Sequence, residues 1–368
     1  MNSEQLLRRR LIAAASSCTA AWSMPAAVGA AVGTAGLVTQ SDARAASAGK
    51  DAGPEAAAVQ HPIIVLNSRD ADVSLIHPVT HKVLTRISTG KEPHHLYPTP
   101  DNRQVVIGNA MSDSLTFLDP ATGKVTMSVQ GIADPYHLGF SPDQNTFVTC
   151  ANRLDHVDVY RRSGNGDQLS LKLLSRFDLA KTPSHLVFTE DSRVVFCTLQ
   201  ESDELVAIDL KKLAVLWRMK TGRLPAGIAI SPDSKLVFVG CMGENNVHVI
   251  EPRIGNSAGP RLVAAIKTGE GAHAFRNQGN QRHLWVTNRV ANTLSKIDMS
   301  TLKVEAEIRV SGGPDCMDIH RSGKQLWVTQ RWTRSVALVD LDQSKVVKRV
   351  TVGKSPHGVY LHDRADLL

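Results

Sequence analysis

Beyond residue 48 the sequence contains no apolar run that approaches about 18 residues, the length a membrane-spanning helix requires. The same region has no run of lysine and arginine longer than a pair, which argues against nucleic-acid binding through a basic patch. Aromatic residues make up only 5% of the 368 residues, although apolar residues make up 42%. These absences favour a soluble globular chain assembled from many small packing units.

Motifs of nucleophilic, zinc-protease and nucleotide chemistry are also absent. The chain has no G-x-S-x-G, H-E-x-x-H, phosphate-binding loop or C-x-x-C. Four of its five cysteines follow residue 48, and their spacing indicates no disulfide. Two of them, Cys150 and Cys241, fall in apolar runs and are predicted to be buried thiols.

The first 48 residues have the composition of an export signal. Arg8 to Arg10 precede an apolar, alanine-rich segment, and an A-x-A-type cleavage site ends at Ala48. Paired arginines before a long, moderately hydrophobic segment favour twin-arginine export over an ordinary secretory signal. The sequence predicts a periplasmic protein with a signal over residues 1–48, a disordered leader over 49–61 and one domain over 62–368.

An evenly spaced anchor organises the rest of the chain. It is a proline, replaced once by alanine, and the seven copies are Pro93, Pro135, Pro183, Pro225, Ala272, Pro314 and Pro356. Steps of 42 to 48 residues between copies indicate seven repeats of one supersecondary unit. After each anchor comes a tight turn such as Ser141-Pro142-Asp143, and after each turn a short apolar β-run.

Seven four-stranded units of this length predict an all-β, seven-bladed β-propeller, because radial closure leaves only short strand edges exposed. The first repeat supplies three strands over residues 63–87, and the segment 358–362 is expected to add its missing inner strand. That pairing joins the two ends of the domain and closes the ring. The alternative, an open β-solenoid, requires capping units that the sequence does not contain.

Three β-runs carry a more specific pattern, WVTN at 285–288, WVTQ at 327–330 and FVTC at 147–150. With the Gly-x-x-Pro and Ser-Pro-Asp turns, they resemble the Tyr-Val-Thr-Asn repeat of the YVTN, or YncE-like, family of periplasmic seven-bladed propellers, over residues 63–362. The resemblance implies that the strand after each anchor is innermost and lines the central channel. A looser resemblance links the chain to propellers that bind d1-type haem, the NirF type and the haem domain of cytochrome cd1. In these, histidines and arginines at one face hold the ligand.

Histidine gathers directly after the anchors. The first position after the anchor holds His94, His273 and His357, and the second position holds His95, His137 and His185. Six of the 14 histidines thus occupy 14 positions, where an even distribution places fewer than one. If the inner strands line the channel, these rings are expected at the rim of one mouth.

Imidazole is a common ligand of Zn, Cu and Fe, and a nearby thiol suits soft metals. The predicted metal set is His95, His137, His185 and Cys316, although Cys316 also fits as a small residue in place of glycine. His94 is expected to point away from His95, because neighbouring strand residues alternate faces. Loop arginines are expected at the same mouth, so the predicted cofactor-binding set is Arg69, Arg153, Arg289, Arg331, Arg334, His94, His273 and His357.

Three functions stay open at this point. The first is binding of a small ligand or cofactor, a transition metal (Cu, Zn or Fe) or a d1-type haem, at a His/Arg-lined mouth. The second is a non-catalytic scaffold for a periplasmic protein partner, with the histidines only lining a polar channel. The third is a lactonase- or lyase-like enzyme that uses a channel histidine as general base, with Asp315 and Glu92 as the carboxylates near the anchors.

Overall fold

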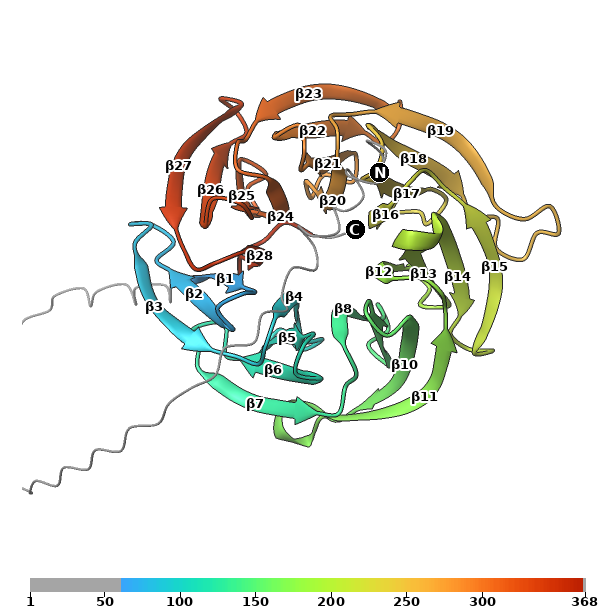
Figure 1. Cartoon of the computed structure of the whole chain (residues 1–368), viewed down its shortest axis with the longest axis horizontal. Helices are drawn as coiled ribbons and strands as arrows, with labels where there is room; N and C mark the ends of the chain where they lie inside the picture. Colours follow the sequence, from blue (N-terminus) through green and yellow to red (C-terminus); the bar gives the residue numbers. More distant parts are fainter. Residues whose placement is uncertain (1–60, 367–368) are drawn as a thin grey trace, which may run out of the picture. The chain divides into compact units, whose positions relative to one another are not determined.

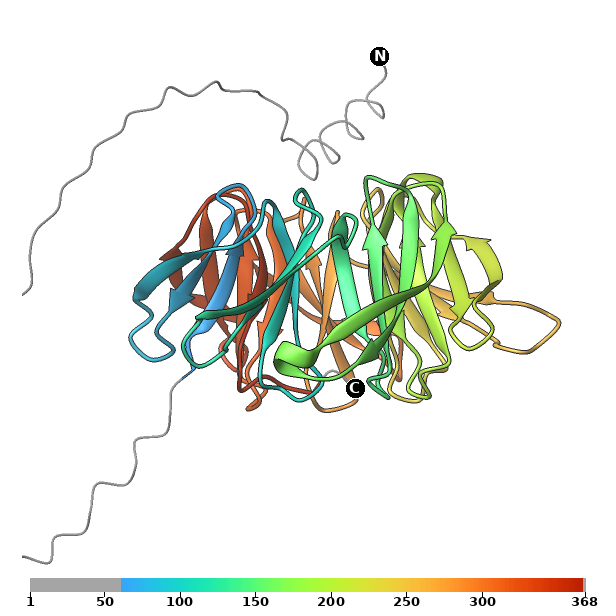
Figure 2. The ribbon, with the colours of Figure 1, turned by 90° about the horizontal axis from the view of Figure 1, so that it is seen from below.

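The computed structural model describes residues 61–366, which form 28 β-strands and two short 3₁₀ helices. The strands make seven antiparallel four-stranded sheets set radially around a centre (Figure 1). In the edge-on view the inner strands run between the two faces of the ring (Figure 2). The predicted seven-bladed β-propeller is therefore confirmed.

Each blade is one sheet, whose strands follow one another from the channel outward. Blade 1 contains β28 (Pro356–Tyr360), β1 (Ile63–Asn67), β2 (Asp72–Ile76) and β3 (Val83–Ser88). Blade 2 contains β4 (Pro93–Pro98), β5 (Val105–Asn109), β6 (Ser114–Leu118) and β7 (Val125–Gln130). Blade 3 contains β8 (Pro135–Phe140), β9 (Thr146–Ala151), β10 (His156–Ser163) and β11 (Ser170–Asp178). Blade 4 contains β12 (Pro183–Phe188), β13 (Val194–Leu199), β14 (Glu204–Asp209) and β15 (Ala214–Lys220).

Blade 5 contains β16 (Pro225–Ile230), β17 (Val237–Cys241), β18 (Asn246–Glu251) and β19 (Arg261–Lys267). Blade 6 contains β20 (Ala272–Asn277), β21 (His283–Asn288), β22 (Thr293–Asp298) and β23 (Lys303–Arg309). Blade 7 contains β24 (Pro314–Ile319), β25 (Gln325–Gln330), β26 (Ser335–Asp340) and β27 (Lys345–Thr351). The 3₁₀ helices are η1 (Gly166–Gln168) and η2 (Gln200–Ser202).

The ring closes as the sequence predicts. Strand β28 pairs antiparallel with β1, with Val359 opposite Val65 and Tyr360 opposite Ile64. Gly353 strengthens the junction by donating its N–H to Oδ1 of Asn67 at 2.9 Å. The last strand therefore completes the sheet that the first strand begins.

Apolar side chains hold neighbouring blades together. At the junction of blades 3 and 4, for example, Val148 and Val157 pack in one buried cluster with Leu186, Val195 and Val206. Each of the seven junctions has its own cluster of this kind. Burial of each large aliphatic side chain contributes roughly 1.5–3 kcal/mol, so stability is distributed around the ring and not concentrated in one core.

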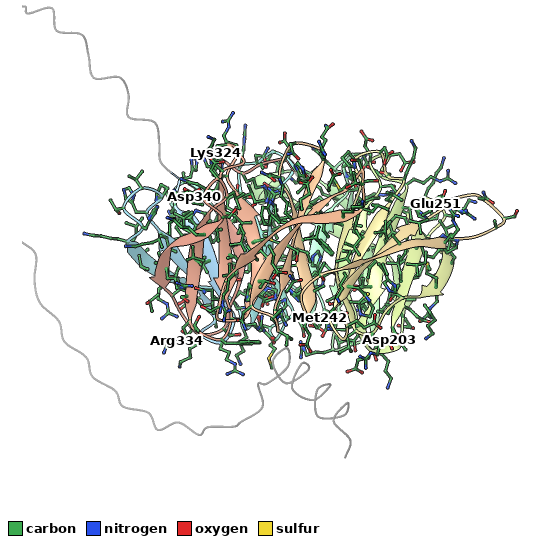
Figure 3. All side chains as sticks on the ribbon, turned by 90° about the horizontal axis from the view of Figure 1, so that it is seen from above. Asp203, Met242, Glu251, Lys324, Arg334 and Asp340 are labelled. Carbon is green, nitrogen blue, oxygen red and sulfur yellow. The ribbon has the colours of Figure 1, made fainter. Side chains whose placement is uncertain are left out.

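The anchors and the loops after the second strand of each blade lie on one face of the propeller. Figure 3 shows Asp203, Met242 and Arg334, each on such a loop, on one face and Lys324 on the opposite face. The N–H of Met242 donates to the carbonyl of Leu224, the residue before the blade 5 anchor, at 3.0 Å. Leu224 has a φ of 50°, and the residue before the anchor has a positive φ in the other blades too. The loop and the anchor of a blade are thus tied together.

Within residues 61–366 the structure contains no helix long and apolar enough to span a bilayer. The predicted export signal, and the leader as far as residue 60, lie outside the described residues.

Candidate functional site

A β-bulge at the start of the inner strands places two consecutive side chains at the channel. In blade 4 the register shifts between Pro183 and Leu186, so His185 lies outside the regular ladder. Its N–H donates instead to Oγ1 of Thr198 at 3.1 Å, and that hydroxyl donates to the carbonyl of Ala226 in blade 5 at 2.7 Å. The threonine hydroxyl thus satisfies backbone groups that the bulge leaves unpaired.

The bulge shows that the expected opposite orientation of His94 and His95 is wrong. Their ring centroids are 5.0 Å apart, and one nitrogen of each lies within 4.8 Å of the other and of a His357 nitrogen. Alternation of faces applies to a regular strand, whereas blade 2 shifts register between Pro93 and Leu96. Both rings therefore belong to the channel.

The histidines at the second position after the anchor, His95, His137 and His185, meet in the channel from blades 2, 3 and 4. Ring centroids are 4.3 Å apart for His95 and His137, 4.8 Å for His137 and His185, and 4.9 Å for His95 and His185. One nitrogen of each ring lies within 4.8 Å of one nitrogen of the other two. We call these three residues the histidine triad. Nitrogens around a tetrahedral zinc ion are about 3.4 Å apart, so small ring movements complete a three-nitrogen site.

Each ring of the histidine triad has one buried nitrogen without a hydrogen-bond partner: Nε2 of His95, Nδ1 of His137 and Nε2 of His185. The other nitrogen of two rings is held by a hydroxyl, since Ser184 Oγ lies 2.9 Å from Nδ1 of His185 and Tyr97 Oη lies 3.0 Å from Nε2 of His137. Buried polar atoms are nearly always hydrogen-bonded. Unpartnered nitrogens on three neighbouring rings therefore suit the coordination of a ligand, and the hydroxyls resemble the outer partners that orient metal-binding histidines.

Burial keeps the histidine triad neutral. The three side chains are between 4% and 6% exposed. Burial, with a smaller contribution from His273, lowers the pKa of His137 to about 3. Burial and the neighbouring rings lower the pKa of His95 and of His185 well below the ordinary value. Neutral imidazole is the form that binds metals, so its lone pairs are available at neutral pH.

Asp315, at the first position after the blade 7 anchor, is the centre of a buried ion-pair network. Its Oδ1 accepts a hydrogen bond from Nη2 of Arg289, and its Oδ2 lies 3.1 Å from Nη1 of Arg331. Nδ1 of His273 faces Oδ1 at 2.9 Å. Burial raises the pKa of Asp315, but Arg289, His357 and His273 together lower it well below its usual range. A carboxylate fixed in this way is unsuited to the role of general base.

Cys316 lies apart from the histidine triad. Its Sγ is 3.4 Å from Nδ1 of His357, and that nitrogen is 2.6 Å from the carbonyl oxygen of His94. Burial, followed by the charge of Asp315, raises the pKa of Cys316 well above its ordinary value. The thiol is therefore protonated in the absence of a metal, and its ligand-forming neighbours are Asp315 and His357, not the triad. Of the predicted metal set, the structure brings the three histidines together, and Cys316 is not beside them.

Two of the five predicted arginines reach the channel, Arg289 and Arg331, and both bind Asp315. Arg153 is 44% exposed and pairs with Asp134 at 3.2 Å, while Arg69 and Arg334 lie at the surface. All six channel histidines are at most 6% exposed. The predicted residues are thus brought together in part: the six histidines, Arg289 and Arg331 are buried in the channel, and Arg69, Arg153 and Arg334 are exposed on loops of the same face.

Asp134 is a carboxylate near an anchor that the sequence pattern did not single out. It directly precedes Pro135, as Glu92 precedes Pro93, and this shared place in the repeat was the available signal. Burial raises the pKa of Asp134 to about 6 despite opposing contacts with Arg153. Burial also raises the pKa of Glu92. Because Arg153 binds Asp134 through both its backbone N–H, at 2.6 Å, and its side chain, we treat Asp134 as a structural group.

Open space next to the histidine triad lies on the side away from the anchors. A cavity of about 480 Å³, which we call the chamber, is lined by His137 and Tyr97 and by the turns that follow the inner strands, including Pro100 and Pro142. Those turns belong to the face opposite the anchors. Of the histidine triad, His137 lines the chamber, so the chamber adjoins the triad at the blade 3 ring.

The sequence model of the YncE-like β-propeller family matches residues 19–367. The chain belongs to this family. The YncE-like assignment and the seven-bladed fold agree with the resemblance carried by the WVTN-type runs. Comparison with curated protein sequences gives no match.

Solved structures similar to this YncE-like propeller include a functionally unknown protein from Desulfotomaculum acetoxidans DSM 771, with a TM-score of 0.69 and 14% identity over 82% of this chain and 98% of that one. A second is dihydro-haem d1 dehydrogenase NirN in complex with DHE, with a TM-score of 0.62 and 15% identity over 84% and 77%. A third is hydrazine synthase of Kuenenia stuttgartiensis, with a TM-score of 0.61 and 20% identity over 74% and 90%. Identities this low show a shared fold and nothing about ligands.

Proposed function

We propose that this YncE-like propeller binds a first-row transition metal ion at the histidine triad. The observation that carries the proposal is the set of three buried, unpartnered nitrogens on His95, His137 and His185. Three neutral imidazoles suit Zn²⁺, Cu²⁺, Ni²⁺ and Fe²⁺, and the general order of affinity places Cu²⁺ above Zn²⁺. A bound metal in such a site supplies a Lewis acid with a coordination position left over for a further ligand.

The protein's own residues would hold and orient the ion. Ser184 and Tyr97 fix two of the rings through their outer nitrogens, and burial keeps all three rings unprotonated. The chamber lies next to one ring of the triad, His137. These features support a metal-binding site.

The predicted d1-type haem is the second candidate, and the similarity to NirN is in its fold. Two observations favour the ion over the macrocycle. First, the ring centroids of the triad are less than 5 Å apart, so the space between the rings fits a single ion. Second, only two of the five predicted arginines, Arg289 and Arg331, lie near the triad. Both arginines already bind Asp315.

Metal analysis and an absorbance spectrum of the purified protein test the proposal. We expect near-stoichiometric metal, or its uptake on titration with Cu²⁺ or Zn²⁺, and loss of binding in a His95→Ala, His137→Ala, His185→Ala variant. A matched variant with His77→Ala, His248→Ala and His320→Ala, all outside the channel, should bind normally. Strong visible bands with bound iron would favour the haem. A folded protein that takes up neither metal nor haem would leave the docking scaffold as the function.

We also propose that the protein acts in the periplasm, on the basis of the arginine-rich signal over residues 1–48. Cell fractionation of the native protein and of an Arg8→Lys, Arg9→Lys, Arg10→Lys variant tests this. Twin-arginine export predicts that the variant accumulates in the cytoplasm.

A further inference from the structure

We infer that the chamber is a second binding site, which takes a small organic carboxylate with an apolar body. This inference goes beyond the proposed metal site and does not require a bound metal. The chamber lies on the opposite side of the histidine triad from the anchors, and its volume of about 480 Å³ falls within the usual range for small-molecule pockets.

The wall of the chamber is mainly apolar. Phe140, Phe188, Ile228 and Phe275 line it from blades 3, 4, 5 and 6. Phe188 is only 8% exposed, and Phe140, Ile228 and Phe275 are half-buried, so the apolar wall surrounds a space that is partly open to solvent. Aromatic and aliphatic walls of this kind accommodate a ring or a short alkyl chain.

The charge of the chamber wall is positive. Of the described residues that line it, none is acidic, and two are arginines. Arg276 is already neutralised by Asp318, whose Oδ1 accepts a hydrogen bond from Arg276 Nε at 2.6 Å. Arg364 has no carboxylate partner within residues 61–366, and its guanidinium lies over the Tyr360 ring at 5.5 Å. Arg364 therefore brings to the chamber wall a cation without a close carboxylate partner in the described part of the chain, and it also lines a smaller neighbouring cavity with Asp363 and Asp366.

Asn277 supplies a second, independent indication of the ligand's chemistry. It is 4% exposed, and its Nδ2 has no hydrogen-bond partner. Its Oδ1 accepts a hydrogen bond from the N–H of Gly279 at 3.0 Å, and because that backbone group can only donate, the amide orientation is fixed. Asn277 thus brings to the chamber wall an amide whose buried donor is unused. A buried donor and an unpaired guanidinium together call for a ligand with acceptor oxygens and negative charge.

The chain segment after β28 places Arg364 at the chamber. Arg364 forms a backbone bridge with His320, and the N–H of Ala365 donates to the carbonyl of Ile319 at 2.8 Å. Arg276 holds the same segment by donating to the carbonyls of Ala365 and Asp366. The segment is therefore fixed by backbone bonds, and replacement of the Arg364 side chain leaves those bonds in place.

Calorimetric titration of the full-length protein tests the inference with three probes of one shape and different charge. They are 2-naphthoate, the neutral 2-naphthamide and the cationic 2-naphthylmethylamine. We expect naphthoate to bind most tightly and the amine most weakly. Arg364→Gln should lower naphthoate affinity by about tenfold or more, since hydrogen bonds to charged groups contribute roughly that much, and should change naphthamide binding little.

Asn277→Asp is the second variant. It keeps the acceptor for Gly279 and replaces the unused donor by a negative oxygen, so it should also weaken naphthoate binding at least tenfold. Arg321→Gln is the charge-matched control, because Arg321 is outside the chamber wall. Equal binding of the three probes, no binding at millimolar naphthoate, or equal losses in the Arg364 and Arg321 variants would overturn the inference.

The titrations are repeated on chelator-treated protein, which separates the two proposals. If naphthoate binds with the same Arg364 dependence but no metal ever binds, the chamber stands and the metal proposal fails. If metal binds at the histidine triad but naphthoate does not, the metal proposal stands and the chamber inference fails.

Discussion

The phenol oxygen of Tyr97 in blade 2 lies 3.0 Å from Nε2 of His137 in blade 3, and this contact leaves Nδ1 of His137 as the ring's unpartnered nitrogen. Burial raises the pKa of Tyr97, so the hydroxyl is protonated at neutral pH. The contact fixes the ring that belongs to both the histidine triad and the chamber wall. The Tyr97–His137 contact therefore sets the orientation of the one ring that the metal site and the chamber share.

Removal of this hydroxyl should weaken metal binding without unfolding the protein. Tyr97→Phe is expected to lower Zn²⁺ affinity by about tenfold, the lower end of the effect of losing an outer hydrogen-bond partner. Tyr360→Phe is the matched control, because Tyr360 holds the equivalent place on β28 and its hydroxyl contacts His362 instead. Competition titration with a chelator measures both. Equal losses in the two variants would contradict an orienting role for Tyr97.

The metal-free protein should lose stability in mildly acidic solution. Burial lowers the pKa of His137 to about 3 and of His273 to about 4, whereas an unfolded chain protonates its histidines near 6.5. The unfolded state therefore binds more protons below pH 6.5, and stability present above that pH is lost as the pH falls toward 4. Each histidine that stays neutral in the folded state but is protonated in the unfolded state lowers the free energy of unfolding by about 1.4 kcal/mol for every pH unit below 6.5.

Urea unfolding of chelator-treated protein at pH 7.5, 6.0 and 5.0 measures this loss. In a His137→Gln variant the free energy of unfolding should depend less steeply on pH, because about one proton fewer is taken up on unfolding. His77→Ala, at the turn between β2 and β3, should leave the dependence unchanged. A midpoint that is constant between pH 7.5 and 5.0 would show that the channel histidines accept protons in the folded state.

The buried pair of Arg276 and Asp318 should be sensitive to the loss of either partner alone. The two side chains are 4% and 3% exposed, so Asp318→Asn leaves an unpaired buried guanidinium and is expected to cost about 3–5 kcal/mol of unfolding free energy. The double replacement Arg276→Met, Asp318→Leu should recover only part of the lost unfolding free energy, because it removes the unpaired charge but also the Arg276 hydrogen bonds to the carbonyls of Ala365 and Asp366. Asp342→Asn is the control, because its partner Lys324 is 67% exposed, and it should change stability by less than about 1 kcal/mol.

Cys150 and Cys197 should form a disulfide when the protein folds in an oxidising medium. Their sulfur atoms are 3.2 Å apart across the junction of blades 3 and 4, and both residues are fully buried. Refolding with oxidised glutathione, which accepts the two electrons, should lower the mass by 2 Da and link the two peptides. The bond closes a loop of 47 positions and is expected to add about 4 kcal/mol of stability.

Replacement of Cys150 by alanine should abolish the link, whereas replacement of Cys241, which has no second cysteine beside it within residues 61–366, should not. Recovery of both thiols in free form from correctly refolded, glutathione-treated protein would refute the pairing.

The fold could be predicted from the sequence because its determinants are local and repeated. Anchors and the turns that follow the inner strands mark every blade, with alanine in place of proline in blade 6. The three-stranded first repeat requires a closing strand, which the sequence predicts at 358–362 and the structure has at 356–360. Convergence of His95, His137 and His185 follows from their equal place in three consecutive blades. These conclusions need only the repeat length and the position of the inner strand.

The finer features of the site depend on contacts that the repeat does not encode. The bulge that turns both His94 and His95 into the channel is one example, since strand periodicity alone predicts opposite faces. Asp315 binds Arg331 of its own blade 7 and Arg289 of the neighbouring blade 6, and both contacts depend on loop conformations that the repeat does not specify. The proximity of Cys150 to Cys197 likewise arises from packing between blades.

Closure of the ring by β28 has a consequence for how the protein is made. Until residues 356–360 leave the ribosome, β1 lacks its inner neighbour, and the chain is an open arc with a free hydrogen-bonding edge. Such an edge can accept the last strand of another copy as readily as its own, which is the geometry of a strand-exchanged dimer. Synthesis at high local concentration should therefore favour exchanged dimers, and slow, dilute folding should favour the closed monomer.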